Sequence, residues 1–131
     1  MLIVTDVLLA TDSDALVAEV HAALGDADTT IRLVRAGADV RDAVAAQTPD
    51  LVVLDLQIGN MGGIATSIDL RLESDMGRLQ RVPILLLLDR DADVYLAERS
   101  LADSWLIKPL DALSLGQAAR DLLHDTTTEM A

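Results

Sequence analysis

The feature that most constrains the fold of this chain is the alternation of short apolar runs with segments of helical period. Five runs rich in Val, Ile and Leu lie near residues 5–10, 30–34, 51–54, 84–88 and 104–107. Each run is followed by a segment in which apolar residues recur every three or four positions, as on one face of a helix. Strands that alternate with helices in this way predict βα units around a parallel sheet, and therefore an α/β fold.

The helical segments are recognised by their apolar faces and by the residues at their ends. Gly25 ends the first helix, and Pro49 follows the second, which is predicted near 38–46. Asp111 stands where its side chain would cap the fifth helix. The positions predicted to face the core are, in chain order, Leu16, Val20 and Leu24; Val40 and Val44; Ile64, Ile68, Leu72 and Met76; Val94, Ala97 and Leu101; Leu115, Ala119 and Leu122.

Length and composition fit one domain with an aliphatic core. The chain has 131 residues, of which 51% are hydrophobic, which is enough to bury a core of ordinary size. We expect the domain to cover residues 1–125 and the tail 126–131 to be disordered. Because the helical pattern ends near His124, we expect no attached output domain, so that any effect is exerted on a separate protein.

Composition disfavours several locations and partners. The absence of Cys excludes disulfides and thiolate metal sites and suits a reducing cytoplasm. There is no basic leader, and no apolar run approaches the roughly 20 residues that cross a bilayer, so we expect a cytoplasmic protein without membrane contact. A formal net charge of −12 opposes binding to nucleic acid, and one Trp, one Tyr and no Phe give no stacking surface for bases or a flavin.

Charged residues follow three of the predicted strands. Asp12 follows the first strand, Asp55 the third and Lys108 the fifth. The carboxyl ends of parallel strands lie at one edge of the sheet, where ligands of open α/β folds bind, so these side chains are predicted to meet. Each has an ordinary explanation alone: Asp12 as a helix cap, Asp55 as an acceptor for loop amides, and Lys108 as a surface lysine. Their combination indicates a site.

The first strand has two alternative registers. Residues 2–6 and residues 8–12 both read as an apolar run that ends in an acid. Only Asp12 is followed directly by an amphipathic helix, whereas Asp6 is followed by more strand-like sequence. We therefore predict that Asp12 lies at the functional end of the strand, and that Asp6 lies within or before it.

The spacing of these residues matches a known family. Asp12 and Asp55 are 43 positions apart, Lys108 follows Asp55 by 53, and Gly63 follows it by eight. With Pro109 after the lysine, residues 5–124 resemble the receiver domain of bacterial response regulators, the phosphorylated input module of two-component signalling. The resemblance implies a doubly wound (βα)5 flavodoxin-like fold with a five-stranded parallel sheet in the order 2-1-3-4-5. It also implies a cis Lys108–Pro109 bond, which proline permits.

The resemblance also gives each site residue a role. Asp55 would accept the phosphoryl group, and Lys108 would hold a phosphoryl oxygen. Asp12, Asp55 and the backbone carbonyl of Gln57 would bind Mg²⁺, which prefers oxygen ligands and keeps several waters. A carboxylate is a weak nucleophile toward phosphorus and becomes effective when a divalent cation and an ammonium offset the incoming charge.

Several positions depart from the family pattern. Thr11 replaces the first of two adjacent acids, so the resemblance implies that Mg²⁺ binds weakly. Leu88 stands where the family has a Ser or Thr whose hydroxyl grips the phosphoryl group, and Asp89 adds a negative charge where the family has a small residue. Trp105 occupies the position of the family's switch aromatic, which moves together with the Ser or Thr hydroxyl, but Leu88 has no such hydroxyl. Gly59 replaces the usual Pro.

These matches and departures leave two functional interpretations. In the first, the chain is a single-domain response regulator that takes a phosphoryl group from a histidine kinase or a small phosphodonor and changes its affinity for an unidentified target protein. In the second, it is an atypical receiver that acts as an interaction or dimerisation module independent of phosphorylation. A homodimer would use the face of the fourth helix, fifth strand and fifth helix. In neither case is it an enzyme beyond self-phosphorylation and self-dephosphorylation.

Enzymes of similar topology fit the sequence less well. A haloacid dehalogenase phosphatase needs a second Asp two positions after its nucleophile, where this chain has Gln57. A flavodoxin needs a phosphate loop rich in Ser, Thr and Gly after the first strand, but Ser13 is followed by Asp14 and a helix. We interpret His21 and His124 as ordinary helical histidines.

Overall fold

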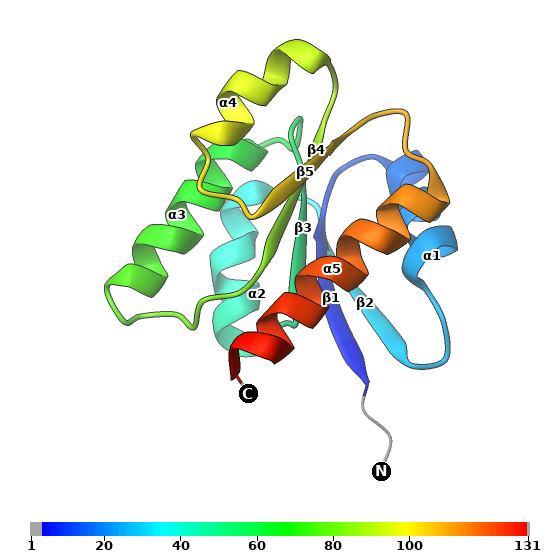
Figure 1. Cartoon of the computed structure of the whole chain (residues 1–131). Coiled ribbons are helices and arrows are strands. Elements are labelled where there is room, and N and C mark those ends of the chain that lie inside the picture. Colours follow the sequence, from blue (N-terminus) through cyan, green and yellow to red (C-terminus); the bar gives the residue numbers. More distant parts are fainter. Residues whose placement is uncertain (1–3, 131) are drawn as a thin grey trace.

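The computed structural model has a parallel sheet of five strands between two layers of helices (Figure 1). It describes the backbone of residues 4–130 and the side chains of residues 4–124. The strands are β1 (Thr5–Ala10), β2 (Thr29–Val34), β3 (Leu51–Asp55), β4 (Ile84–Leu88) and β5 (Ser104–Ile107). Their order is β2-β1-β3-β4-β5 with every pair parallel, which confirms the predicted fold.

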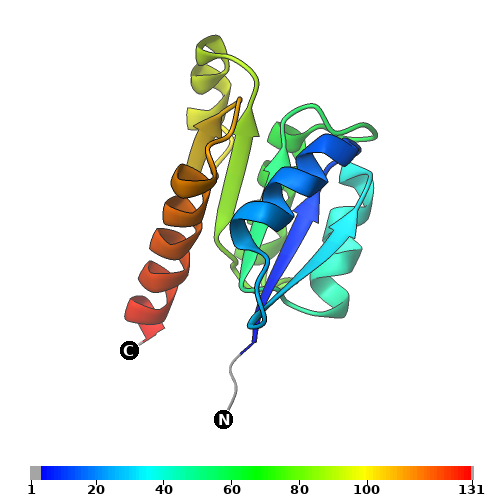
Figure 2. The same cartoon turned by 90° about the vertical axis from the view of Figure 1, so that its right-hand side faces the viewer.

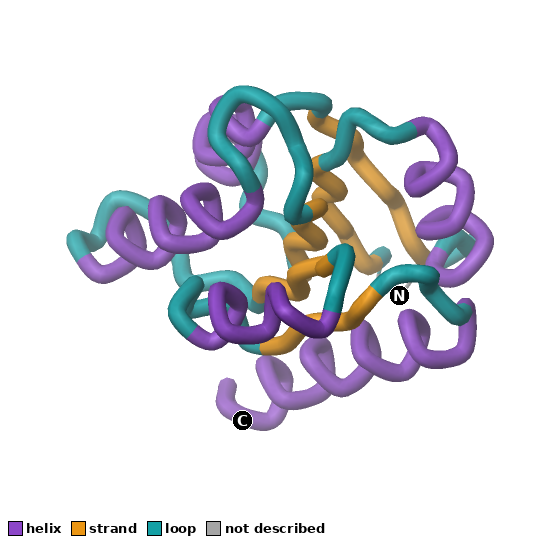
Figure 3. Tube along the Cα trace, turned by 90° about the horizontal axis from the view of Figure 1, so that it is seen from above, coloured by secondary structure: helices purple, strands orange, loops and turns teal. Residues whose placement is uncertain are grey.

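Helices cover both faces of the sheet (Figure 3). The helical elements are α1 (Asp14–Leu24), η1 (Gly37–Asp39), α2 (Val40–Ala46), α3 (Gly63–Asp75), η2 (Asp91–Asp93), α4 (Val94–Glu98) and α5 (Ala112–Met130). α1 and α5 pack against one face, and α2, α3 and α4 pack against the other. The predicted tail 126–131 lies outside the residues whose side chains are described, so that prediction and the domain boundary at 125 stay predictions.

Both faces of the central strands are apolar because both are covered. Leu8, Leu54 and Leu86 belong to the core beneath α2, α3 and α4, and their neighbours Leu9 and Leu87 belong to the core beneath α1 and α5. The strand arrows all point the same way, upward in Figure 2, so the loops after the strands gather at one end of the molecule.

Side-chain caps fix where two helices start. The Ser13 hydroxyl accepts a hydrogen bond from the backbone N–H of Leu16 at 3.2 Å, so Ser13 caps α1 and Asp12 is left in the preceding loop. The Asp111 carboxylate accepts from the Ser114 hydroxyl at 2.9 Å and from the Ser114 backbone N–H at 3.3 Å, as predicted for the cap of α5. These hydrogen bonds hold the pKa of Asp111 below its usual value.

The buried face of α3 differs from the prediction. Four apolar residues were predicted to face inward. Ile64 packs against the core and Ile68 is half-buried, whereas Leu72 is 49% exposed and Met76, just past the end of the helix, is 62% exposed. The buried residues of α3 are instead Gly63, Thr66, Ser67, Leu70, Arg71 and Glu73. The prediction for Leu72 and Met76 was wrong because charged residues on the other face find partners in distant parts of the chain.

The end of α4 also differs from the prediction. Val94 and Ala97 contribute to the core as expected, but the helix ends at Glu98 and Leu101 lies beyond it, 51% exposed and with a φ of 67°. The carbonyl of Leu101 accepts a hydrogen bond from the Arg71 guanidinium at 2.9 Å. In the turn after α4, Leu101 therefore binds Arg71 of α3 through its backbone carbonyl, while its side chain faces solvent.

Candidate functional site

The carboxyl ends of β1, β3 and β5 bring the predicted site residues to one end of the sheet. Asp55 is the last residue of β3, Asp12 follows β1 after one intervening residue, and Lys108 directly follows β5. The Lys108–Pro109 peptide bond is cis, as the resemblance implies. Asp6 lies near the start of β1 and forms an ion pair with Arg32 at 2.9 Å. Asp6 is therefore part of a different network, near the opposite end of the sheet.

Asp55 is a buried carboxylate with both oxygens hydrogen bonded. Its side chain is 3% exposed, and Oδ1 accepts from the Lys108 ammonium at 2.6 Å and from the Gln57 backbone N–H at 3.2 Å. Oδ2 accepts from the Thr11 hydroxyl at 2.7 Å. A buried carboxylate needs such partners, because an unpaired buried charge is strongly unfavourable.

Thr11 has a role that the sequence did not reveal. Its side chain is fully buried, its hydroxyl donates to Asp55, and the same oxygen accepts from the Ser13 backbone N–H at 3.1 Å. At this position the family has a carboxylate that would face a cation, whereas this chain has a hydroxyl that donates a hydrogen bond to Asp55. The absence of the acid was visible in the sequence. The hydrogen bond from Thr11 to Asp55 was not, because the partner of a hydroxyl depends on the three-dimensional arrangement of its neighbours.

Lys108 is shared by two carboxylates. Its ammonium donates to Asp55 Oδ1 at 2.6 Å and to Asp89 Oδ1 at 2.9 Å. Burial lowers the pKa of Lys108, but the hydrogen bonds and charges of Asp55 and Asp89 outweigh that effect and leave the pKa above its usual value. Lys108 is therefore fully charged at neutral pH.

Asp12 contributes the most accessible carboxylate of the group. It is exposed, and Oδ2 accepts a long hydrogen bond from the Gly59 backbone N–H at 3.3 Å. Within the described residues, no group of three or more His, Cys, Asp or Glu side chains is arranged to hold a metal ion. The Asp12 and Asp55 carboxylates with the Gln57 carbonyl are nevertheless oxygen donors of the kind Mg²⁺ prefers. Since both oxygens of Asp55 already have donors, this set fits a loosely held, largely hydrated ion.

The loop after Asp55 is held close to the turn after β2. Gly37 N–H donates to the Gly59 carbonyl at 3.0 Å, and Ala38 N–H donates to the Asn60 carbonyl at 2.7 Å. A side chain at Gly37 would put its Cβ 1.7 Å from the Met61 carbonyl oxygen, so only glycine allows this approach. Sequence analysis did not single out Gly37, because the constraint on this residue comes from a loop that is distant in sequence.

Gly63 permits a second close approach. A Cβ on Gly63 would lie 2.6 Å from the carbonyl oxygen of Asp55 and 3.0 Å from the Cα of Leu56. The first turn of α3 therefore lies directly against the backbone of Asp55. This contact is a physical reason for a glycine eight positions after Asp55 in this chain.

Of the three predicted switch positions, Leu88 lies in the core, Trp105 packs against it, and Asp89 is partly exposed. Leu88 is fully buried at the end of β4 and belongs to the same apolar cluster as the partly buried Trp105 of β5. No hydroxyl is available from Leu88, and the next residue, Asp89, is engaged with Lys108. The end of β4 thus presents a carboxylate to the site.

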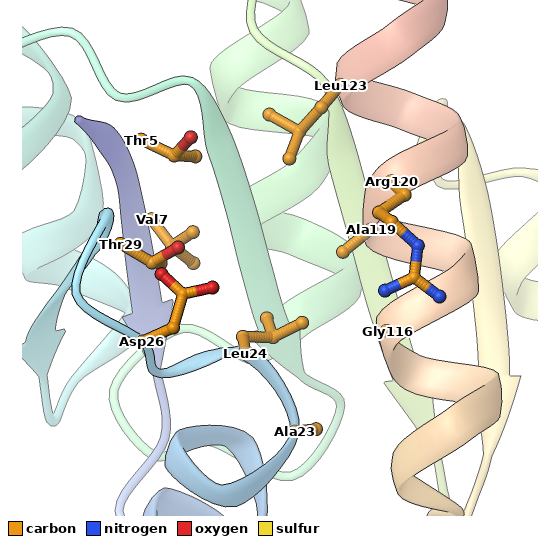
Figure 4. Close-up of a pocket in the computed structure, with 10 residues that line it drawn as sticks. All are labelled: Thr5, Val7, Ala23, Leu24, Asp26, Thr29, Gly116, Ala119, Arg120 and Leu123. Atoms are coloured by element: carbon orange, nitrogen blue, oxygen red, sulfur yellow. The ribbon is translucent and has the colours of Figure 1, made fainter. Parts of the chain in front are cut away.

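A cleft in another part of the molecule is separate from these residues. It lies between α5 and the elements β1, α1 and the start of β2 (Figure 4). Its lining residues are Thr5, Val7, Ala23, Leu24, Asp26, Thr29, Gly116, Ala119, Arg120 and Leu123. None of the predicted site residues contributes to it, so the site is the charged cluster around Asp55.

In the described part of the chain, no helix has both the length and the apolar character needed to span a bilayer.

Comparison with known proteins gives a consistent family assignment. The family model described as the response regulator receiver domain matches residues 7–120. The transcriptional regulatory protein AfsQ1 of Streptomyces coelicolor is 29% identical over 119 residues, which are 89% of this chain and 50% of that protein. The chain therefore spans about half the length of this curated relative.

Solved receiver structures share the fold. A signal receiver domain of a histidine kinase from Syntrophus aciditrophicus has a TM-score of 0.82 at 24% identity, covering 92% of this chain and 91% of that chain. The BeF3-activated N-terminal receiver domain of RstA from Klebsiella pneumoniae has a TM-score of 0.77 at 26% identity, covering 91% of this chain and 98% of that chain. A putative response regulator from Chloroflexus aurantiacus has a TM-score of 0.83 at 19% identity, covering 92% and 98%.

Proposed function

Because this chain belongs to the response regulator receiver domain family, we propose that it signals in a phosphorelay by accepting a phosphoryl group on Asp55. Receiver domains are signalling modules that interact with histidine kinases and phosphodonors. The observation that carries the proposal is the 2.6 Å contact between the Lys108 ammonium and the buried Asp55 carboxylate, at the carboxyl ends of two strands. A carboxylate oxygen therefore lies beside a cation that could hold the transferred group, which supports the proposal.

In the proposed transfer, an oxygen of Asp55 attacks the phosphorus atom of the donor. The new O–P bond forms as the bond from phosphorus to the donor atom breaks, and the donor leaves with that electron pair. Lys108 then donates to a phosphoryl oxygen and offsets its charge. Among the described residues, Oδ1 of Asp55 accepts from Lys108 and from the Gln57 backbone N–H, whereas Oδ2 accepts only from Thr11 and keeps a lone pair for the attack.

We propose that Mg²⁺ assists this transfer and binds weakly. Asp12, Asp55 and the Gln57 carbonyl would hold the ion, which when bound neutralises negative charge on the incoming phosphoryl group. The protein residues define where it binds: Asp12 offers an exposed carboxylate, and the burial of Asp55 excludes water from one side of the site.

Intact mass after incubation with acetyl phosphate and Mg²⁺ tests the proposal. We expect wild type to gain phosphoryl mass and Asp55→Asn to gain none, because a carboxamide is not a competent acceptor. Asp14→Asn, which removes an exposed carboxylate at the start of α1, should be modified as wild type is. Modification that persists in Asp55→Asn would identify a different acceptor, and a wild type that is never modified would overturn the proposal.

The metal part of the proposal predicts a specific loss in Asp12→Asn. We expect the affinity for Mg²⁺ to be in the millimolar range or weaker in wild type, and to fall about tenfold further when one of two carboxylate ligands is removed. Trp105, the single tryptophan, reports binding by its fluorescence during Mg²⁺ titration. Asp14→Asn is again the matched control, and an unchanged Mg²⁺ response in Asp12→Asn would remove Asp12 from the site.

For partners and location, we propose cytoplasmic signalling through protein contacts. The phosphoryl source would be a histidine kinase or a small phosphodonor, and the target is a protein of unknown identity. The net charge of −12 favours neither nucleic acid nor an anionic membrane as a direct partner. Action as a single domain remains part of this proposal.

A second function is favoured by the departures at the site. Thr11 and Asp89 occupy the hydrogen-bonding positions around Asp55 and Lys108, as expected of a receiver that works without phosphorylation. Such a module would bind its partner or a second copy through the face of α4, β5 and α5, where Tyr95 is 62% exposed and Leu113 is 79% exposed. Under this alternative, Asp55→Asn would leave binding and dimerisation unchanged.

A further inference from the structure

Asp89 is the one acidic neighbour of Lys108 that the proposed transfer does not use. Its side chain is 29% exposed, and its Oδ1 lies 2.9 Å from the ammonium of Lys108, whose side chain is 25% exposed. The other partner of this ammonium is Asp55, at 2.6 Å. An ammonium has three N–H donors, so two of the three are already engaged.

The backbone around Asp89 leaves its side chain free for Lys108. The turn after β4 is capped by Asp93, whose Oδ2 accepts from the backbone N–H of Asp89 at 3.2 Å and from that of Arg90 at 2.9 Å. The backbone N–H of Lys108 donates to the Leu88 carbonyl at 2.8 Å, and this hydrogen bond holds the ends of β4 and β5 together. These contacts position the backbone of both residues, and because Asp93 caps the turn, the Asp89 carboxylate is not needed as a helix cap.

A phosphoryl group on Asp55 would meet this arrangement directly. It would bring negatively charged oxygens to a cation that is already paired with a second carboxylate, and those oxygens would repel Asp89. Either Asp89 moves away from Lys108 or the phosphoryl group is held by fewer donors. Both outcomes weaken the phosphorylated state.

We propose that Asp89 is a positioning residue that competes with the phosphoryl group for Lys108, and thereby limits how readily Asp55 takes up and keeps that group. The inference rests on the proposed function, because it assumes that Asp55 is the acceptor. It adds a regulatory element: the unmodified domain carries its own carboxylate in contact with the lysine that the phosphoryl group requires.

Binding of fluoroberyllate, a phosphoryl mimic, to Asp89→Asn tests the competition. The amide keeps the shape of the side chain and removes its charge, so we expect this variant to bind the mimic about two to five times more tightly than wild type, the range for a partly exposed ion pair. Asp91→Asn is the matched control, since it removes one exposed charge two residues further on in η2. This control distinguishes the effect of losing the contact between Asp89 and Lys108 from the effect of changing the net charge by one.

A second readout is independent of phosphorylation. Lys108 is the only lysine in the sequence, so protein labelled with ¹⁵N-lysine gives one ammonium signal that needs no assignment. In Asp89→Asn we expect this signal to shift, because one of the two carboxylates that accept a hydrogen bond from the ammonium has been replaced by an amide. In Asp91→Asn it should stay in place.

The two readouts distinguish the possible failures. A Lys108 signal that is unaffected by Asp89→Asn, or affinity for fluoroberyllate equal to that of Asp91→Asn, would overturn the inference while leaving Asp55 as the acceptor. A shifted Lys108 signal with no fluoroberyllate binding in either wild type or Asp89→Asn would overturn the proposed function, and the inference with it.

Discussion

Replacing Arg71 by Met is expected to lower the free energy of unfolding by about 3 kcal/mol, because it leaves buried and partly buried acceptors without this donor. The Arg71 side chain is 3% exposed and its guanidinium donates to the carbonyls of Leu101 at 2.9 Å and Val82 at 2.6 Å. It also pairs with the Asp103 carboxylate. Burial lowers the pKa of Arg71, opposed by the charge of Asp103, yet an arginine this close to a carboxylate stays charged.

Chemical denaturation of Arg71→Met beside Arg81→Met measures this effect. Arg81 reaches the other oxygen of Asp103 at 3.8 Å but its side chain is 63% exposed, so its loss should cost less than about 1 kcal/mol. Methionine fills most of the volume of either arginine stem, which separates lost hydrogen bonds from lost packing. Equal and small losses in the two variants would show that the Arg71 network contributes little to stability.

The same network explains why the orientation of α3 could not be predicted. The apolar residues of this segment recur at helical spacing, so the sequence correctly predicts a helix. The helix places Leu72 and Met76 outward because Arg71 is paired with the chain after α4, and Glu73 is paired with Arg41 of α2 and with Arg78. All of these partners except Arg78 are distant in sequence, and hydrophobic periodicity carries no information about any of them.

The site was more predictable, for a topological reason. Parallel strands deliver the residues at their carboxyl ends to one edge of the sheet, so the positions of Asp55 and Lys108 at strand ends were enough to predict that they meet. The hydrogen bonds of Thr11 and Asp89 depend on which way each side chain turns, and they were visible only as departures from a pattern. The structure shows Thr11 as a donor to Asp55 and Asp89 as a partner of Lys108.

With Thr11 and Asp89, the negative charge of the site is distributed differently from the family pattern. Relative to the family pattern, a carboxylate is missing next to Asp12, where a cation would bind, and one is present next to Lys108, where a phosphoryl group would be held. The number of carboxylates is conserved, but both changes act against a phosphorylated Asp55. This chain should therefore respond weakly to phosphorylation even where the acceptor is intact.

We accordingly expect fluoroberyllate to change the fluorescence of Trp105 only modestly in wild type, and much more in the double variant Leu88→Thr with Asp89→Ala. A ligand shifts a two-state equilibrium only by its differential affinity for the two states. A threonine hydroxyl at the end of β4 would lack a good partner without the mimic and gain a charge-assisted hydrogen bond with it. That difference amounts to roughly 1.5 to 3 kcal/mol, or about tenfold or more in the population of the bound-state conformation.

The control for this experiment is Leu88→Val with Asp89→Ala, because valine has the shape of threonine and no hydroxyl. Leu88 is fully buried beside Ala97 and the Trp105 cluster, so either substitution leaves a similar cavity, and both variants should lose stability to a similar degree. The difference in their Trp105 response to fluoroberyllate then measures the hydroxyl alone. Equal responses of the two variants, or a large response in wild type, would show that Leu88 does not limit the switch and that another donor reaches the phosphoryl group.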